Sequence, residues 1–112
     1  MMQSTEAAAV CECLASSVRL DVFRLLVKHA PQGLVAGEIG RTLEIAPTNL
    51  SFHLKALAQS GLCAVTQEGR FLRYRANLGL MGDWIAFLMA ECCQGSGCAA
   101  ATLPPTDCHT PS

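Results

Sequence analysis

The sequence has little charge, few aromatic side chains and no long hydrophobic run. Only 15% of its 112 residues are charged and 5% are aromatic, whereas 51% are hydrophobic. No uninterrupted apolar segment reaches the ~18–20 residues that a membrane-spanning helix needs. The N-terminal stretch MMQSTEAAAVCECLASS also lacks the basic start of a signal peptide. These absences predict a cytoplasmic globular protein with no membrane partner, and with apolar surface that an oligomer interface would cover.

Cysteine, by contrast, is plentiful, with seven residues in the chain. In a reducing cytosol an odd, high count indicates metal binding or thiol redox chemistry rather than a disulfide framework. Three of the thiols lie in the segment ECCQGSGC, as Cys92, Cys93 and Cys98. An enzyme is not expected, because the chain has no Cys-x-x-Cys motif and its histidines lie in other elements than the adjacent pair.

Apolar periodicity predicts one ordered domain over residues 1–98, followed by a disordered tail over 99–112 that has no period and contains two adjacent prolines. We expect helices at about 5–14, within 16–30, within 34–44, at about 47–60 and at about 79–93. Two strand-like segments over about 62–76 flank the turn at Glu68 and Gly69. This order predicts a mainly α fold with a small β-hairpin, a winged helix-turn-helix. The last helix is apolar on nearly every side, so another subunit or other helices must bury it.

The helix at 47–60 is the expected recognition helix for double-stranded operator DNA. Leu50, Leu54 and Leu57 form its core stripe, so the opposite face is free to enter the major groove. Asparagine can bind adenine bidentately, serine and threonine can bond bases or phosphates, and lysine reaches phosphate. The candidate DNA contacts on this helix are Thr48, Asn49, Ser51, Phe52, His53 and Lys55.

The hairpin adds positive charge beside the recognition helix. Residues 41–75 carry five basic side chains against two acidic ones, a net charge of +3 in a chain whose total is −1. Arg70, Arg73 and Arg75 crowd this short ribbon, which suits a wing that holds phosphates or a minor groove. Arg70 at the tip is expected to matter most, ahead of Arg73, because the others can pair with Glu68 or Asp83.

Three segments, LASSVRLDVFRLL, NLSFHLKALAQSGL and EGRFLRYR, resemble matching parts of the ArsR/SmtB family of bacterial metal-responsive repressors. The Ser51–His53–Leu54 pattern and the Gly69-Arg70 turn are its most family-like marks, and the similarity covers about residues 12–92. The resemblance implies a homodimer with the first and last helices at the interface. It also implies that the protein represses a small operon until a metal or metalloid binds.

The usual sensor sites of the family are not matched. Many arsenic-responsive members carry a Cys-x-Cys-x-x-Cys set in the first helix of the helix-turn-helix, where LVAGEIG stands here. Zinc-responsive members use Asp and His pairs on the last helix, where Asp83 is present but Ile85 replaces the histidine. A few relatives place a Cys-Cys…Cys set after that helix, which Cys92, Cys93 and Cys98 match.

Three thiolates without a fourth ligand suit As(III) or Sb(III), which bind three soft sulfur atoms. A methylated As(III) species accepts two thiolates, which Cys92 and Cys93 can supply. Two other groupings compete, namely Cys11 with Cys13 and Cys63 of the partner subunit, or the first set extended by Cys108 and His109. A zinc, cadmium or lead sensor, and a repressor whose thiols report oxidation, are the alternative functions.

Overall fold

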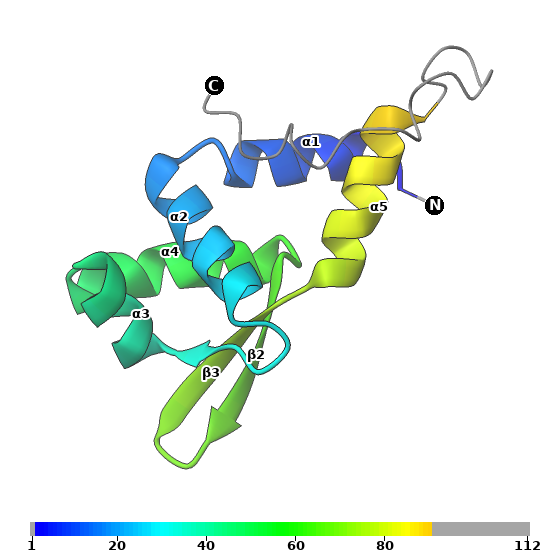
Figure 1. Ribbon diagram of the computed structural model, residues 1–112. Coiled ribbons are helices and arrows are strands. Elements are labelled where there is room, and N and C mark those ends of the chain that lie inside the picture. Colours follow the sequence, from blue (N-terminus) through cyan, green and yellow to red (C-terminus); the bar gives the residue numbers. More distant parts are fainter. Residues whose placement is uncertain (1, 91–112) are drawn as a thin grey trace, which may run out of the picture.

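The computed structural model describes residues 2–90 and confirms the predicted winged helix-turn-helix (Figure 1). Five helices and three strands follow one another as α1 (Ser4–Cys13), α2 (Ser17–Lys28), β1 (Leu34–Val35), α3 (Ala36–Leu43), α4 (Pro47–Gln59), β2 (Cys63–Glu68), β3 (Phe71–Ala76) and α5 (Leu78–Met89). None of the helices in this part of the chain is long and apolar enough to cross a membrane. The predicted tail at 99–112 lies outside the described residues.

Local signals in the sequence account for the bounds of the helices. The hydroxyl of Ser16 accepts a hydrogen bond from the amide of Arg19 at 3.3 Å, which caps α2. Pro47 occupies the first turn of α4, where its missing amide hydrogen is not needed. After α4 the chain turns at Gly61, whose φ of +86° is favourable only for glycine.

The sheet contains a strand that periodicity did not predict. β3 lies between β1 and β2 and is antiparallel to both, with Leu34 opposite Tyr74 and Val65 opposite Tyr74 on the other side. The helix predicted within residues 34–44 begins only at Ala36, because Leu34 and Val35 pair with β3 instead. Two residues are too few to show a period of two.

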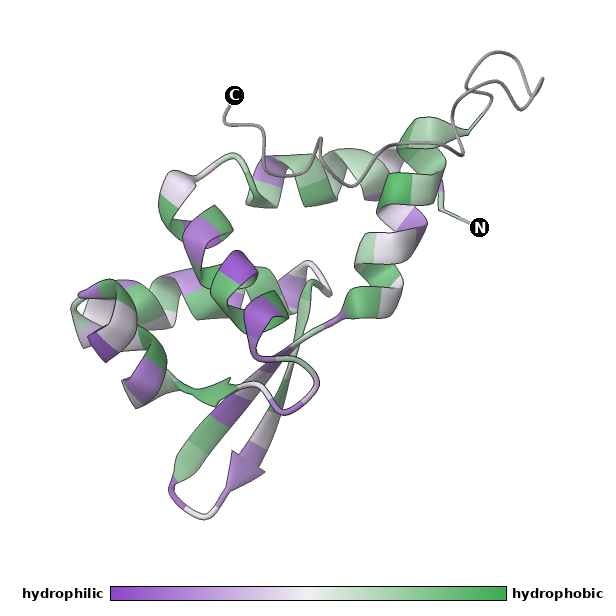
Figure 2. Cartoon of the chain, in the orientation of Figure 1, coloured by the Kyte–Doolittle hydropathy of each residue, from purple (hydrophilic) through white to green (hydrophobic). Residues whose placement is uncertain are grey.

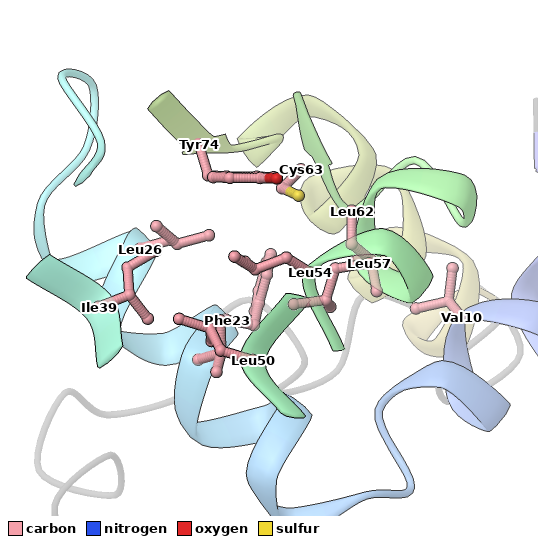
Figure 3. Packing of buried hydrophobic residues seen from close by; sticks show 11 residues of the cluster. Val10, Phe23, Leu26, Ile39, Leu50, Leu54, Leu57, Leu62, Cys63 and Tyr74 are labelled. Atoms are coloured by element: carbon pink, nitrogen blue, oxygen red, sulfur yellow. The ribbon is translucent and has the colours of Figure 1, made fainter. Parts of the chain in front are cut away.

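The core lies between α2, α3, α4 and the inner face of the hairpin (Figure 3). The predicted stripe of α4 is confirmed, since Leu50, Leu54 and Leu57 are at most 3% exposed. Leu26 and Ile39 reach the same cluster from α2 and α3 and are fully buried. This packing fixes the stripe of α4 inward, and therefore fixes which of its side chains face outward.

α1 and α5 pack together away from the wing (Figure 1). The indole of Trp84 in α5 donates a hydrogen bond to the backbone oxygen of Ala7 at 3.1 Å. α5 runs from Leu78 to Met89, and the last residues of the predicted helix over 79–93 lie outside the described residues. None of the α5 residues is buried, and Ile85 and Leu88 are half exposed in a helix that is apolar along most of its length (Figure 2).

Candidate nucleic-acid interface

α4 presents a polar face on the side opposite its core stripe. Thr48, Asn49, Ser51 and Lys55 are all exposed, as the helical period requires once the leucines are buried. These side chains offer amide, hydroxyl and ammonium groups, the chemistry that reads base edges and holds phosphates in a major groove. Their contact with DNA stays a prediction, and the geometry leaves them free to make it.

Phe52 and His53 form an aromatic pair at the edge of this face. Their ring centroids lie 5.7 Å apart with an interplanar angle of 70°, an edge-to-face arrangement. Phe52 is 67% exposed, an unusual state for a large apolar side chain unless it meets another surface. His53 is half-buried, and its buried Nδ1 has no hydrogen-bond partner within residues 2–90. An exposed phenyl ring at this position suits contact with a thymine methyl group.

The arginines of the wing differ in how far their charge is neutralised. Arg73 donates through Nε to both carboxylate oxygens of Glu68 at 3.0 Å, and through Nη1 to the backbone oxygen of Gly33 at 3.3 Å. Arg75 donates to the hydroxyl of Thr66 at 2.8 Å, and its Nη2 lies 3.8 Å from the same carboxylate. The expected pairing with Glu68 is therefore confirmed.

Arg70 occupies the tip of the hairpin, beside Gly69, which adopts a φ of +63°. Among residues 2–90 no carboxylate lies within ion-pair distance of the Arg70 guanidinium. Arg70 therefore carries the unshared positive charge of the wing. We still expect it to contribute more to DNA binding than the other arginines of the wing. Polar residues dominate this tip, in contrast to the apolar α5 (Figure 2).

The predicted metal ligands Cys92, Cys93 and Cys98 lie outside the described residues, as do Cys108 and His109. The cysteines within the described residues do not form a site, and residues 2–90 hold no cluster of three metal-ligating side chains. Cys11 is exposed, while the half-buried Cys13 directs its thiol to the backbone oxygen of Ala56 at 3.7 Å. The two thiols of α1 therefore lie in different surroundings, one exposed and the other against α4.

Cys63 is buried at the start of β2, as expected for a core thiol. Burial, and to a lesser extent the neighbouring Cys13, raises the pKa of the Cys63 thiol to about 11. Figure 3 shows the ring of Tyr74 beside this thiol, and burial followed by Cys63 raises the pKa of the Tyr74 hydroxyl as well. A thiol that resists deprotonation is a poor soft-metal ligand.

Asn77, which sequence reasoning did not single out, joins the end of the recognition helix to the start of α5. Its side-chain oxygen accepts from the amide of Leu80 at 3.1 Å and caps α5, while its side-chain nitrogen donates to the backbone oxygen of Gly61 at 2.9 Å. Its own amide donates to the oxygen of Leu62 at 2.9 Å. An asparagine before an apolar helix is a capping signal, but its second partner is visible only in three dimensions.

Comparison with known proteins identifies a helix-turn-helix domain in the chain. Residues 14–66 match a helix-turn-helix domain family, a span that holds α2, α3, α4 and the start of the wing. No protein with a curated function matches the sequence.

Solved structures resemble most of the described chain. An ArsR-like transcriptional regulator from Rhodococcus sp. RHA1 is 25% identical, with a TM-score of 0.66 over 75% of this chain and 76% of that one. HlyU from Vibrio cholerae N16961 is 26% identical, with a TM-score of 0.65 over 81% and 96% of the two chains.

A homodimeric winged helix-turn-helix DNA-binding domain from Mycobacterium bovis shares the fold at 24% identity, with a TM-score of 0.61 over 81% of this chain and 91% of that one. The fold, the exposed polar face of α4 and the basic wing agree with these likenesses. The chain therefore has a winged helix-turn-helix fold that contains a helix-turn-helix domain, and it is similar to ArsR-like transcriptional regulators.

Proposed function

We propose that the protein is a homodimeric repressor that leaves its operator when As(III) or Sb(III) binds Cys92, Cys93 and Cys98. One observation carries the proposal: three thiols lie within seven residues of sequence, beginning three positions after the end of α5. Soft trivalent arsenic and antimony prefer sulfur ligands, and three thiolates complete their coordination. Binding displaces three protons, so affinity falls at acid pH.

The chemistry of the other cysteines supports this choice of ligands. Burial raises the pKa of the Cys63 thiol to about 11, so this thiol is protonated at neutral pH. The thiol of Cys13 lies against the backbone oxygen of Ala56. Cys11 is exposed and lies on another side of α1 from Cys13. An ion that needs three thiolates therefore finds a better set in the segment 92–98 than in α1 and β2.

The surface of α5 supports the homodimer. The apolar side chains of Leu78, Ile85 and Leu88 are each about half exposed in the single chain. Asp83 is the one charged residue of α5. Water around such a helix is unfavourable, and a second copy of α5 would remove it. The relative from Mycobacterium bovis is described as homodimeric, which agrees with this arrangement.

α5 is connected directly to the wing and to the end of α4. β3 ends at Ala76 and α5 begins at Leu78, with Asn77 between them bonded to Gly61 at the end of the α4 segment. A displacement of α5 after metalloid binding would therefore act on both the wing and α4. In a dimer that reads two half-sites about one DNA turn apart, a small change in the spacing of the two α4 helices lowers DNA affinity.

Thiol protection tests the ligand assignment directly. The full chain is treated with iodoacetamide with and without arsenite, and each cysteine is followed by peptide mass spectrometry. We expect arsenite to protect Cys92, Cys93 and Cys98, while exposed Cys11 is alkylated equally in both samples. Equal alkylation of the three residues with and without arsenite rejects the site. The same experiment with zinc, cadmium, lead and peroxide separates the alternative inducers from arsenite.

A further inference from the structure

A cavity of about 340 Å³ lies between α3, α4 and β3, at the other end of the molecule from α1 and α5. Leu50 and Leu54 of α4 and Tyr74 of β3 line its buried part. Leu72, two positions before Tyr74, lies on the same face of the strand and extends the apolar wall. Its volume is at the small end of the range of about 300–1,000 Å³ that is typical of small-molecule sites.

The α3 wall of the cavity contains two glycines. Gly37 and Gly40 lie three residues apart on α3 and both line the cavity. A Cβ atom on Gly40 would come within 3.4 Å of Cδ2 of Leu50, so the bare backbone of Gly40 faces the apolar side chains of α4. A larger residue at this position would take up room that the cavity now has.

Arg41 is the charged residue that lines the cavity. Its Nη1 lies 3.7 Å from the position of a Cβ atom on Gly37, so the guanidinium rests along the glycine wall of α3. Within the described part of the chain Arg41 has no ion pair. The nearby carboxylate of Glu38 instead accepts a hydrogen bond from the amide of Val35 at 3.4 Å. An unpaired guanidinium beside an apolar cavity is matched to a carboxylate, which it binds with two parallel hydrogen bonds.

We propose that this cavity binds a small organic acid, and that its occupancy weakens DNA binding. The apolar body of the acid lies against Leu50, Leu54 and Leu72, and its carboxylate pairs with Arg41. A sugar phosphate does not fit, because it would place hydroxyl groups against a predominantly apolar lining. A neutral hydrocarbon leaves the guanidinium without a partner.

Occupancy affects DNA binding because two walls of the cavity are the recognition helix and a strand of the wing. Ser51, a candidate DNA contact of α4, lies at the cavity, and the bound carboxylate cancels the positive charge of Arg41. A ligand beside Ser51 disturbs a DNA contact, and the loss of positive charge at Arg41 lowers affinity for a polyanion. The site lies apart from Cys92, Cys93 and Cys98 in sequence, and the proposal does not depend on the arsenic proposal.

The test uses 4-phenylbutyrate as the probe and 4-phenylbutan-1-ol as its uncharged match, added to the full chain without arsenite. Methyl NMR spectra follow the leucine side chains, and fluorescence anisotropy follows binding to the DNA upstream of the gene. Arg41→Gln removes the charge at the cavity. Arg24→Gln removes another exposed charge, on α2 and outside the cavity, and is the control.

We expect the acid to shift the methyl signals of Leu50, Leu54 and Leu72 and to lower DNA affinity. Arg41→Gln should weaken the acid about threefold to fivefold, as for an exposed ion pair, and should leave the alcohol unchanged. Arg24→Gln should alter neither. The proposal is overturned if the shifts are absent or confined to α1 and α5, if acid and alcohol bind equally well, or if DNA affinity is unchanged at saturation.

Discussion

Arg73 and Glu68 form the closest ion pair of the wing, with Nε of the arginine 3.0 Å from both carboxylate oxygens. The two residues are diagonal neighbours across the hairpin, because Arg73 lies opposite Thr66 and Glu68 lies opposite Phe71. The same carboxylate is 3.8 Å from Arg75. One acidic side chain thus neutralises part of two arginines, and the free charge of the wing is concentrated at Arg70.

Replacing Arg70 should therefore weaken DNA binding more than replacing Arg73. For Arg70→Gln we expect lower affinity and a salt dependence whose slope is smaller by about 0.9 per subunit, the value for one lost phosphate contact. Glu68→Gln should have the opposite effect, because it frees Arg73 and Arg75. Anisotropy titrations of labelled DNA at several salt concentrations measure both. An Arg70→Gln variant with the salt slope of the wild type would show that the tip does not contact phosphate.

Gly33 and Gly69 make a matched pair for testing the hairpin. Both have positive φ, +76° and +63°, so alanine is strained at either position by about 1 kcal/mol. At Gly33 the added Cβ would also overlap the backbone oxygen of Tyr74, whereas nothing lies within 4 Å of it at Gly69. We expect a loss of about 1 kcal/mol for Gly69→Ala and about 3 kcal/mol or more for Gly33→Ala in urea unfolding. Equal losses would contradict the close approach of β1 and β3.

Cys63 should make stability depend on alkaline pH. Its pKa is about 11 in the folded chain and 9.0 ordinarily, so below pH 9 the thiol is protonated in both states. Between pH 9 and 11 the unfolded chain releases this proton first, and stability falls by up to about 1.4 kcal/mol per pH unit. Urea unfolding at pH 8 to 10.5 should show a steeper decline for the wild type than for Cys63→Ala. Parallel declines would show that the thiol is not shielded.

Asn77 should transmit changes between α5 and α4. Asn77→Asp keeps the oxygen that caps α5 but cannot donate to the backbone oxygen of Gly61. We expect the variant to fold and bind DNA, while arsenite lowers its DNA affinity by a smaller factor than in the wild type. Gln32→Glu, which makes the same amide-to-carboxylate change at an exposed loop residue outside α4 and α5, is the control. An unchanged arsenite effect in Asn77→Asp would remove this residue from the coupling path.

The parts of the fold that rest on periodicity were predictable from the sequence. The leucine stripe of α4 has the spacing of one helix face, and its burial then determines which residues face outward. The pairing of Glu68 with the wing arginines was also expected, because the turn at Gly69 brings them together. Both the burial of the leucines and the pairing of Glu68 depend on residues that are close together in the sequence.

The features that depend on distant contacts could not be predicted. β1 is two residues long and exists because Leu34 and Val35 meet β3. The cavity beside Arg41 requires α3, α4 and β3 to be placed in space, although the spacing of Gly37 and Gly40 was visible.

The most direct test of the central claim is the release of DNA by arsenite. Labelled DNA from upstream of the gene is bound by the full chain, and anisotropy is recorded as arsenite is added. We expect the wild type and Cys11→Ser to release DNA at the same arsenite concentration, and Cys92→Ser and Cys98→Ser to remain bound. Release from the Cys92→Ser and Cys98→Ser variants at the wild-type concentration would contradict the claim that Cys92, Cys93 and Cys98 hold the inducer.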